Sequence, residues 1–402
     1  MIDKKKRHYN SLSLLAVVTL LCFAQIDNLQ AGAREQARRI HDRLAGVPPT
    51  DAVLGLMETD INNNDVAAAA NRAMANRNFY NVTLKNFITP WTNEEQTVFA
   101  SLNDYTATVI GIIRDDKDFR EILYGDIIYT GDENNTSLAA YSNSSNQHYI
   151  DMETQGLDLS DDAVLVENEQ SAVTGLPADA TAGVITTRAA ARAFFVDGTN
   201  RAMFRFTLLN HLCADMEQIK DNTRATDRIR QDASRSPGGD SRIYINACSG
   251  CHAGMDPMMQ AYAYYDFTYT DNVETGALEY NESNDPETGS RVQPKFLQNA
   301  TVFPYGYVTP DDRWDNYWRE GPNSVLGWDA ALPGSGNGAK SMGQELAHTE
   351  AFASCQVKKV FRAVCLREPS GAQISSLTSN FKNSGYRLKS VFADAVSYCM
   401  GD

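Results

Sequence analysis

Five consecutive residues carry the clearest chemical signature in the sequence: Cys248-Ser249-Gly250-Cys251-His252. This Cys-x-x-Cys-His spacing is typical of covalent attachment of a c-type haem. Two thiols separated by two residues on a helical turn match the two vinyl groups of the porphyrin, to which they add as thioethers. The imidazole of His252 then lies under the iron as its proximal ligand. The motif therefore predicts one covalently bound haem c, held by Cys248, Cys251 and His252.

Three other uses of the two cysteines fit the sequence less well. A redox-active dithiol is expected on a thioredoxin-like βαβ background, which the hydrophobic pattern does not show. A zinc site needs a second pair of ligands nearby, whereas the next cysteine along the chain is Cys355. A disulfide between Cys248 and Cys251 leaves His252 without a role. Haem attachment uses all three side chains, so it is the preferred interpretation, and no other metal is expected.

The sixth iron ligand must approach the haem face opposite His252, which restricts the choice. Met255 follows His252 by only three residues, on the same side of the chain, and is therefore rejected. Met342 is the preferred candidate, because it is expected in a glycine-rich loop at 334–343, where the backbone can approach a flat cofactor closely. His348 and an open or water-bound iron are the alternatives.

Four further cysteines, Cys213, Cys355, Cys365 and Cys399, allow three disulfide pairings. If residues 351–366 form one helix, Cys355 and Cys365 are separated by roughly 15 Å, at 1.5 Å per residue. A disulfide needs Cα atoms within about 4.4–6.8 Å. The spacing therefore excludes a link between these two residues, and predicts that each pairs with either Cys213 or Cys399. Four free buried thiols are the alternative.

The N-terminal segment is typical of a secretory signal. A basic region at residues 4–7 precedes an apolar stretch from Ser11 to Ala24, which is too short to span a bilayer readily. Two cleavage points fit, one after Ala24 and one after Ala33, and an uncleaved anchor is the alternative. We expect export to the periplasm, with the outer surface or secretion as further options. No later segment reads as a membrane span of the mature chain.

Composition excludes several classes of protein. With 43% hydrophobic and 22% charged residues in 402, the chain is too apolar and too lightly charged to be disordered. Its 36 basic residues face 51 acidic ones, for a net charge of −15. Nucleic acid is therefore not expected as a partner, because polyanion binding depends on Lys and Arg neutralising phosphates.

The elements that position the motif are predicted to be mainly α-helical. Residues 34–45 read as a helix ended by Gly46, and strand signals are few and short. The sequence divides into a helical N-terminal domain at 34–235, a cytochrome c-like haem domain at 236–345 and a C-terminal helical segment at 346–402. Residues 131–182 are polar and are expected to be mostly loop.

Directly after the motif, the sequence suggests a break between two helices. Gly254 is expected to end the helix that carries the motif. Asp256-Pro257 then resembles the N-cap and first turn of a second helix at 257–264. A capping role for Asp256 is preferred to a catalytic one.

Short segments in a fixed order accompany the motif over most of the mature chain: 39–49, 118–123, 184–187, 200–201, 212–213, the motif with Met255-Asp256-Pro257, 351–355, 361–362 and 384–389. The order of these segments resembles a family of planctomycete-type monohaem cytochrome c-like proteins. The chain departs from the family pattern just before the motif, where Arg235-Ser236-Pro237-Gly238-Gly239 replaces a proline run. The resemblance implies haem and export, and it supplies no substrate.

Three classes of function fit one haem in an exported acidic chain. Electron transfer with an unidentified redox partner protein is preferred, although a simple carrier needs far fewer residues. A haem enzyme of peroxidase or oxygenase type, with an open distal site, is the first alternative. A scaffold with structural haem is the second. The optical spectrum separates the first two, since low-spin six-coordinate iron favours transfer and high-spin accessible iron favours catalysis.

Overall fold

The computed structural model describes residues 31–286 and 288–401, so the expected signal segment at 1–24 lies outside the described residues. The fold is mainly helical, with 52% helix and 7% strand, which confirms the expectation of a mainly α protein. The α-helices are α2 (Ala33–Ala45), α3 (Asp51–Asn62), α4 (Val66–Met74), α5 (Lys85–Ile88), α6 (Asp104–Arg114), α7 (Gln147–Thr154), α8 (Gln170–Thr174), α9 (Arg188–Phe194), α10 (Arg201–Leu212), α11 (Ser241–Ile243), α12 (Ser249–Met259), α13 (Gly338–Ala347), α14 (Glu350–Cys365), α15 (Gly371–Asn383) and α16 (Leu388–Val396).

The strands form three separate antiparallel pairs, each of two strands. Their bounds are β1 (Ile128–Gly131), β2 (Leu165–Asn168), β3 (Tyr265–Thr268), β4 (Ala277–Tyr280), β5 (Arg313–Asp315) and β6 (Ser335–Asn337). In the first pair, Ile128 lies opposite Asn168 and Gly131 opposite Leu165. The stretch 131–182 contains β2, α7 and α8, but most of its residues lie outside these elements, which confirms the expectation of mostly loop. Four-residue strands paired across such a distance leave no alternating pattern long enough to recognise.

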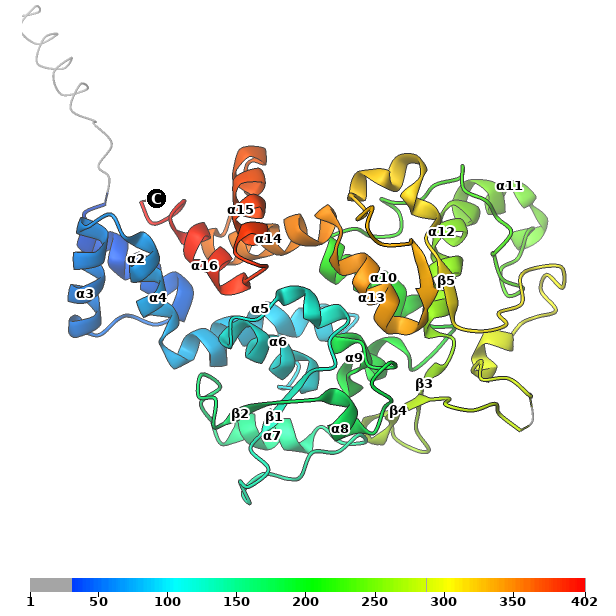
Figure 1. Ribbon diagram of the computed structural model, residues 1–402, viewed down its shortest axis with the longest axis horizontal. Helices are drawn as coiled ribbons and strands as arrows, with labels where there is room; N and C mark the ends of the chain where they lie inside the picture. Colours follow the sequence, from blue (N-terminus) through cyan, green and yellow to red (C-terminus); the bar gives the residue numbers. More distant parts are fainter. Residues whose placement is uncertain (1–30, 287, 402) are drawn as a thin grey trace, which may run out of the picture.

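The first helix ends where the sequence predicts. Gly46 follows α2 in the left-handed conformation, with φ 71°, and its N–H bonds to the carbonyl of Asp42. A left-handed C-cap favours glycine, because a Cβ atom is strained there. Ile40 and Leu44, four residues apart, both point into the core. The helices α2, α3 and α4 pack together at one end of the molecule (Figure 1).

The C-terminal helices return to cover this N-terminal end. The helix α16 packs against α2, α4 and α14, and α14 packs against α10 (Figure 1). Buried apolar side chains from Ala37 to Cys399 form one continuous hydrophobic core. The division at residues 235 and 345 stays a prediction, and this core crosses both boundaries.

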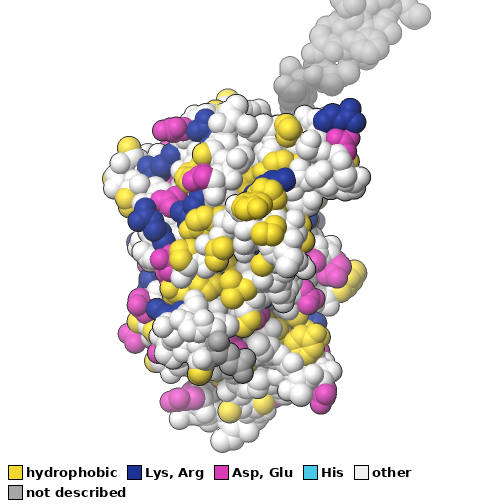
Figure 2. Space-filling model, turned by 90° about the vertical axis from the view of Figure 1, so that its right-hand side faces the viewer, with side chains coloured by type: hydrophobic (Ala, Val, Ile, Leu, Met, Phe, Trp, Pro, Cys, Tyr) yellow, Lys and Arg dark blue, Asp and Glu magenta, His cyan; other side chains and the backbone are white. Residues whose placement is uncertain are grey.

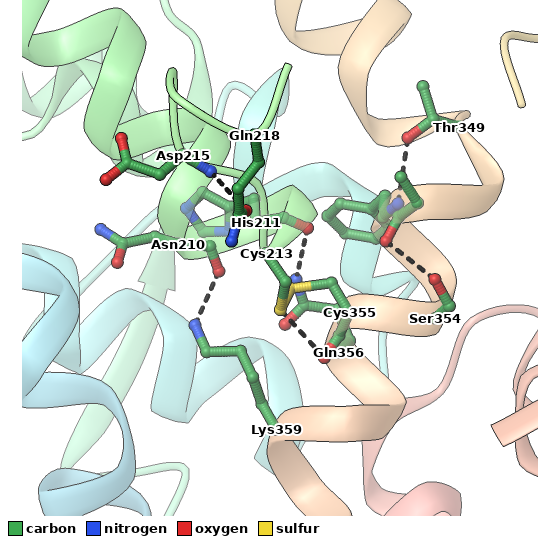
Figure 3. Close-up of a disulfide and its surroundings, with 12 residues drawn as sticks. Asn210, His211, Cys213, Asp215, Gln218, Thr349, Ser354, Cys355, Gln356 and Lys359 are labelled. Carbon is green, nitrogen blue, oxygen red and sulfur yellow. Dashed lines mark hydrogen bonds between the residues drawn. A yellow bond between two sulfur atoms is a disulfide. The ribbon is translucent and has the colours of Figure 1, made fainter. Parts of the chain in front are cut away.

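Two disulfides fix the C-terminal helices. Cys213, just after α10, is bonded to Cys355 in α14 (Figure 3), and Cys365 is bonded to Cys399. Cys355 and Cys365 lie in the single helix α14, as expected, and each has a different partner. The structure thus confirms the exclusion of a link within this helix. It also selects one of the two pairings that the sequence left open.

Candidate haem-attachment site

The Cys-x-x-Cys-His motif lies at the start of α12. A π-helical segment, Tyr244–Cys248, continues directly into this helix, so both cysteines belong to consecutive helical turns. Of the six cysteines described, Cys248 and Cys251 are free and half-buried, and the other four form disulfides. Two free thiols, one turn apart and partly exposed, fit the expected pair of haem attachment points.

The second turn of the motif is held by a neighbouring loop. The N–H of Asp221 donates to the carbonyl of Gly250 at 2.9 Å. A Cβ atom on Gly250 would lie only 2.3 Å from Oδ1 of Asn222, so a larger residue here would force the Asn222 side chain to move. The Sγ atom of Cys251 lies 3.6 Å from the carbonyl oxygen of Met216 in the same loop region. Burial raises the pKa of the Cys251 thiol, which therefore stays protonated at neutral pH.

His252 is oriented by a carboxylate of its own helix. Its Nδ1 atom lies 3.1 Å from Oδ1 and 3.2 Å from Oδ2 of Asp256, one helical turn further along α12. A carboxylate only accepts hydrogen bonds, so Nδ1 carries the proton and donates. Among the described residues, no hydrogen bond engages Nε2 of His252, whose side chain is 21% exposed. The ring thus presents Nε2 as the atom free to bind a metal.

Asp256 is fully buried and is held from two other segments. Arg201, at the start of α10, donates from Nε to Oδ1 at 2.9 Å and from Nη2 to Oδ2 at 3.0 Å. The backbone N–H of Arg230 donates to Oδ2 at 3.2 Å. Burial by itself raises the pKa of Asp256, but the Arg201 charge and the His252 hydrogen bond lower it well below its ordinary value. Asp256 is therefore an anion at neutral pH.

The predicted break after the motif is wrong. The helix α12 runs without interruption from Ser249 to Met259, with Pro257 inside it, and no helix begins at 257. Gly254 does not end the helix. It lies in close contact with the side chain of Trp318. Asp256 does not cap a helix, because its carboxylate accepts from His252 and Arg201.

The role of Asp256 as the partner of His252 was not predicted from the sequence. A signal was present, since a spacing of four residues places Asp256 on the helix face of His252. The Asp-Pro pair favoured the alternative of a helix start. No local signal pointed to Arg201, which is 51 residues before His252 in the chain and reaches the site only through the fold.

The two predicted candidates for the sixth ligand lie on or next to α13. Met342 is fully buried inside this helix rather than in a glycine-rich loop, because α13 already begins at Gly338. His348 follows the helix, and its Nδ1 lies 2.8 Å from the carbonyl oxygen of Gln344. Its ring stacks on Tyr124, with ring centroids 5.9 Å apart. The role of either residue as an iron ligand stays a prediction.

The surface beside the motif is apolar. Ile243 and Ile245, in the turns that lead into Cys248, are 46% and 55% exposed. Figure 2 shows hydrophobic side chains gathered across the end of the molecule that carries α11 and α12 in Figure 1. Exposed apolar side chains next to the two thiols suit an apolar porphyrin better than a hydrated metal ion.

Comparison of the chain with protein-family models, with curated proteins and with solved structures finds no match. Within residues 31–286 and 288–401, no three His, Cys, Asp or Glu side chains gather as a metal site would require. None of the helices in this described part combines the length and the apolarity needed to cross a membrane.

Proposed function

We propose that the protein is an exported monohaem c-type cytochrome that transfers single electrons. Cys248 and Cys251 hold the haem covalently, and His252 binds the iron through Nε2. Residues 236–345 form a cytochrome c-like haem domain, and the exported chain works in the periplasm with a redox partner protein. The arrangement of His252 carries the proposal: Asp256 engages its Nδ1, its Nε2 has no hydrogen-bond partner in the described part of the chain, and the two free thiols lie on the same helical stretch.

The attachment chemistry needs only these residues and the two vinyl groups. Each thiol adds across one vinyl double bond, so that sulfur bonds to one carbon and the thiol hydrogen goes to the other. No oxidant is consumed. When bound, the haem supplies a one-electron redox centre. Both cysteines are half-buried, so they would hold the group at the surface of the protein, where a redox partner could reach it.

Haem staining tests the attachment. We expect the full-length chain, expressed in a bacterial host with working c-type maturation, to give a haem-stained band on a denaturing gel. The Cys251→Ala variant should weaken the band and the Cys248→Ala/Cys251→Ala variant should remove it. Ser249→Ala, within the motif but without a reactive group, should stain as the parent does. An unstained parent band would refute covalent haem.

The resting optical spectrum of the haem-loaded protein tests the activity. Low-spin six-coordinate iron that does not bind cyanide or carbon monoxide readily supports electron transfer. High-spin iron that binds these ligands at once contradicts it and supports the haem-enzyme alternative.

A further inference from the structure

The carboxylate of Asp256 is placed to influence the proposed iron ligand, His252, through the ring nitrogen that does not bind the metal. Asp256 accepts a hydrogen bond from His252 on the side of the ring opposite Nε2, and it is completely shielded from solvent. We propose that Asp256 is a positioning residue that fixes the His252 ring and strengthens it as an electron donor, so that the bound haem has a lowered reduction potential. This inference rests on the proposed haem attachment.

The geometry makes the ring orientation rigid. His252 and Asp256 lie four residues apart on α12, so their side chains share one face of the helix. Arg201 from α10 and the backbone of Arg230 hold the carboxylate from outside this helix. Asp256 therefore cannot turn away from His252 without breaking three hydrogen bonds to other segments.

The charge of Asp256 gives the contact its electronic effect. A carboxylate that accepts from the outer nitrogen of a metal-binding histidine raises the basicity of the nitrogen that binds the metal. Oxidised iron carries one more positive charge than reduced iron, so a stronger donor stabilises the oxidised form. Hydrogen bonds to the axial ligand are among the levers that set haem potentials. Because Asp256 is buried, solvent screens its charge little.

Arg201 moderates this effect. Its guanidinium binds Asp256, and it also pairs with Asp232 through Nη1 at 2.6 Å and Nη2 at 3.0 Å. Asp232 makes no contact with His252 among the described hydrogen bonds. The carboxylate of Asp256 thus lowers the potential and the Arg201 cation offsets part of that lowering. Changes at the two residues are expected to shift the potential in opposite directions.

A potentiometric titration of the haem-loaded full-length protein tests the proposal. Asp256→Asn keeps the shape and one acceptor oxygen but removes the charge, so we expect the potential to rise. Asp232→Asn is the matched control, because it removes a carboxylate from the same Arg201 without touching His252. Its shift should be clearly smaller. Equal shifts in the two variants would show that the potential responds only to the loss of a nearby negative charge, and would overturn the specific role of Asp256.

Arg201→Gln provides a second readout should Asp256→Asn fail to fold. This variant leaves the carboxylate on His252 with less counter-charge, so the potential should fall below that of the parent. A merely structural role for Asp256 predicts losses of stability or haem content with no shift in potential. Haem-loaded variants that keep the parent potential would overturn this inference alone. A parent chain without covalent haem would instead refute the proposed function.

Discussion

The indole of Trp318 lies directly against the backbone of Gly254, so close that a Cβ atom on the glycine would lie 2.0 Å from Nε1. Trp318 is fully buried and also packs on Phe204, with ring centroids 5.9 Å apart. Gly254 follows His252 by two residues on α12. The contact therefore sets the position of the helix that carries the haem motif.

Gly254→Ala is expected to destabilise the protein by about 1–3 kcal/mol, because overpacking forces α12 and Trp318 apart. Gly55→Ala is the matched control, since Gly55 lies inside α3 with nothing within 4 Å of an added Cβ. The control should stabilise by about 0.5–1 kcal/mol, through the better helix propensity of alanine. Urea unfolding of both variants measures the difference. Equal effects would contradict the close approach of Trp318.

The disulfides should contribute unequally to stability. Cys213–Cys355 closes a separation of 142 residues and Cys365–Cys399 one of 34. On the chain-entropy relation, their removal costs roughly 5 and roughly 4 kcal/mol respectively. We expect Cys213→Ala/Cys355→Ala to unfold at lower urea than Cys365→Ala/Cys399→Ala. The reverse order would show that local packing outweighs loop closure.

Peptide mapping without reduction tests the pairing itself. We expect one link between Cys213 and Cys355, and one between Cys365 and Cys399. Links that join Cys213 to Cys365 would contradict the structure and yet satisfy the spacing argument from the sequence.

Local rules predicted the features that depend on one segment. The end of α2 at Gly46 needs only a left-handed residue and the prolines that follow it. The exclusion of a bond between Cys355 and Cys365 needs only the rise of a helix. The motif at Cys248 is likewise read from five adjacent residues.

Features that depend on distant packing could not be predicted in this way. By local rules, a glycine at 254 indicates the end of a helix. In the structure, Gly254 lies inside the helix and leaves room for the side chain of Trp318, which is 64 residues later in the sequence. In the sequence, Asp256-Pro257 resembles the start of a helix. In the structure, the carboxylate of Asp256 instead binds Arg201 of another helix. Met342 was expected in a loop, but the glycines before it belong to regular structure: Gly336 lies in β6 and Gly338 begins α13.

Lys359 should give stability a distinctive dependence on pH. Its Nζ donates to the carbonyl of Asn210 at 2.6 Å (Figure 3) and lies 3.6 Å from the ring centroid of Trp91. Burial lowers the pKa of Lys359 well below its ordinary value. The unfolded chain therefore binds more protons than the folded one between the lowered pKa and the usual pKa of about 10.4. In that window, stability rises with pH by up to about 1.4 kcal/mol per unit.

Lys359→Met removes the titrating group and keeps the length of the side chain. The stability of the parent relative to this variant should rise as pH increases toward about 10.4, and stay constant below the lowered pKa. Unfolding in urea at a series of pH values measures the difference and cancels the titration of all other groups. A difference that does not change with pH would contradict the lowered pKa of Lys359.

The last prediction concerns the sixth ligand of the proposed haem. Met342 is fully buried in α13, so the cavity left by Met342→Ala would by itself lower the stability of the protein by about 2–5 kcal/mol. That loss would obscure any effect on the iron. Met342→Leu nearly conserves volume, costs less than about 1.5 kcal/mol and removes the thioether. If the sulfur binds iron, this variant loses the thioether-to-iron charge-transfer band at the red end of the visible spectrum and binds cyanide faster than the parent. Met57→Leu, an equally buried exchange on α3, should change neither property. A Met342→Leu spectrum identical to that of the parent would reject the thioether and leave His348 or water as the sixth ligand.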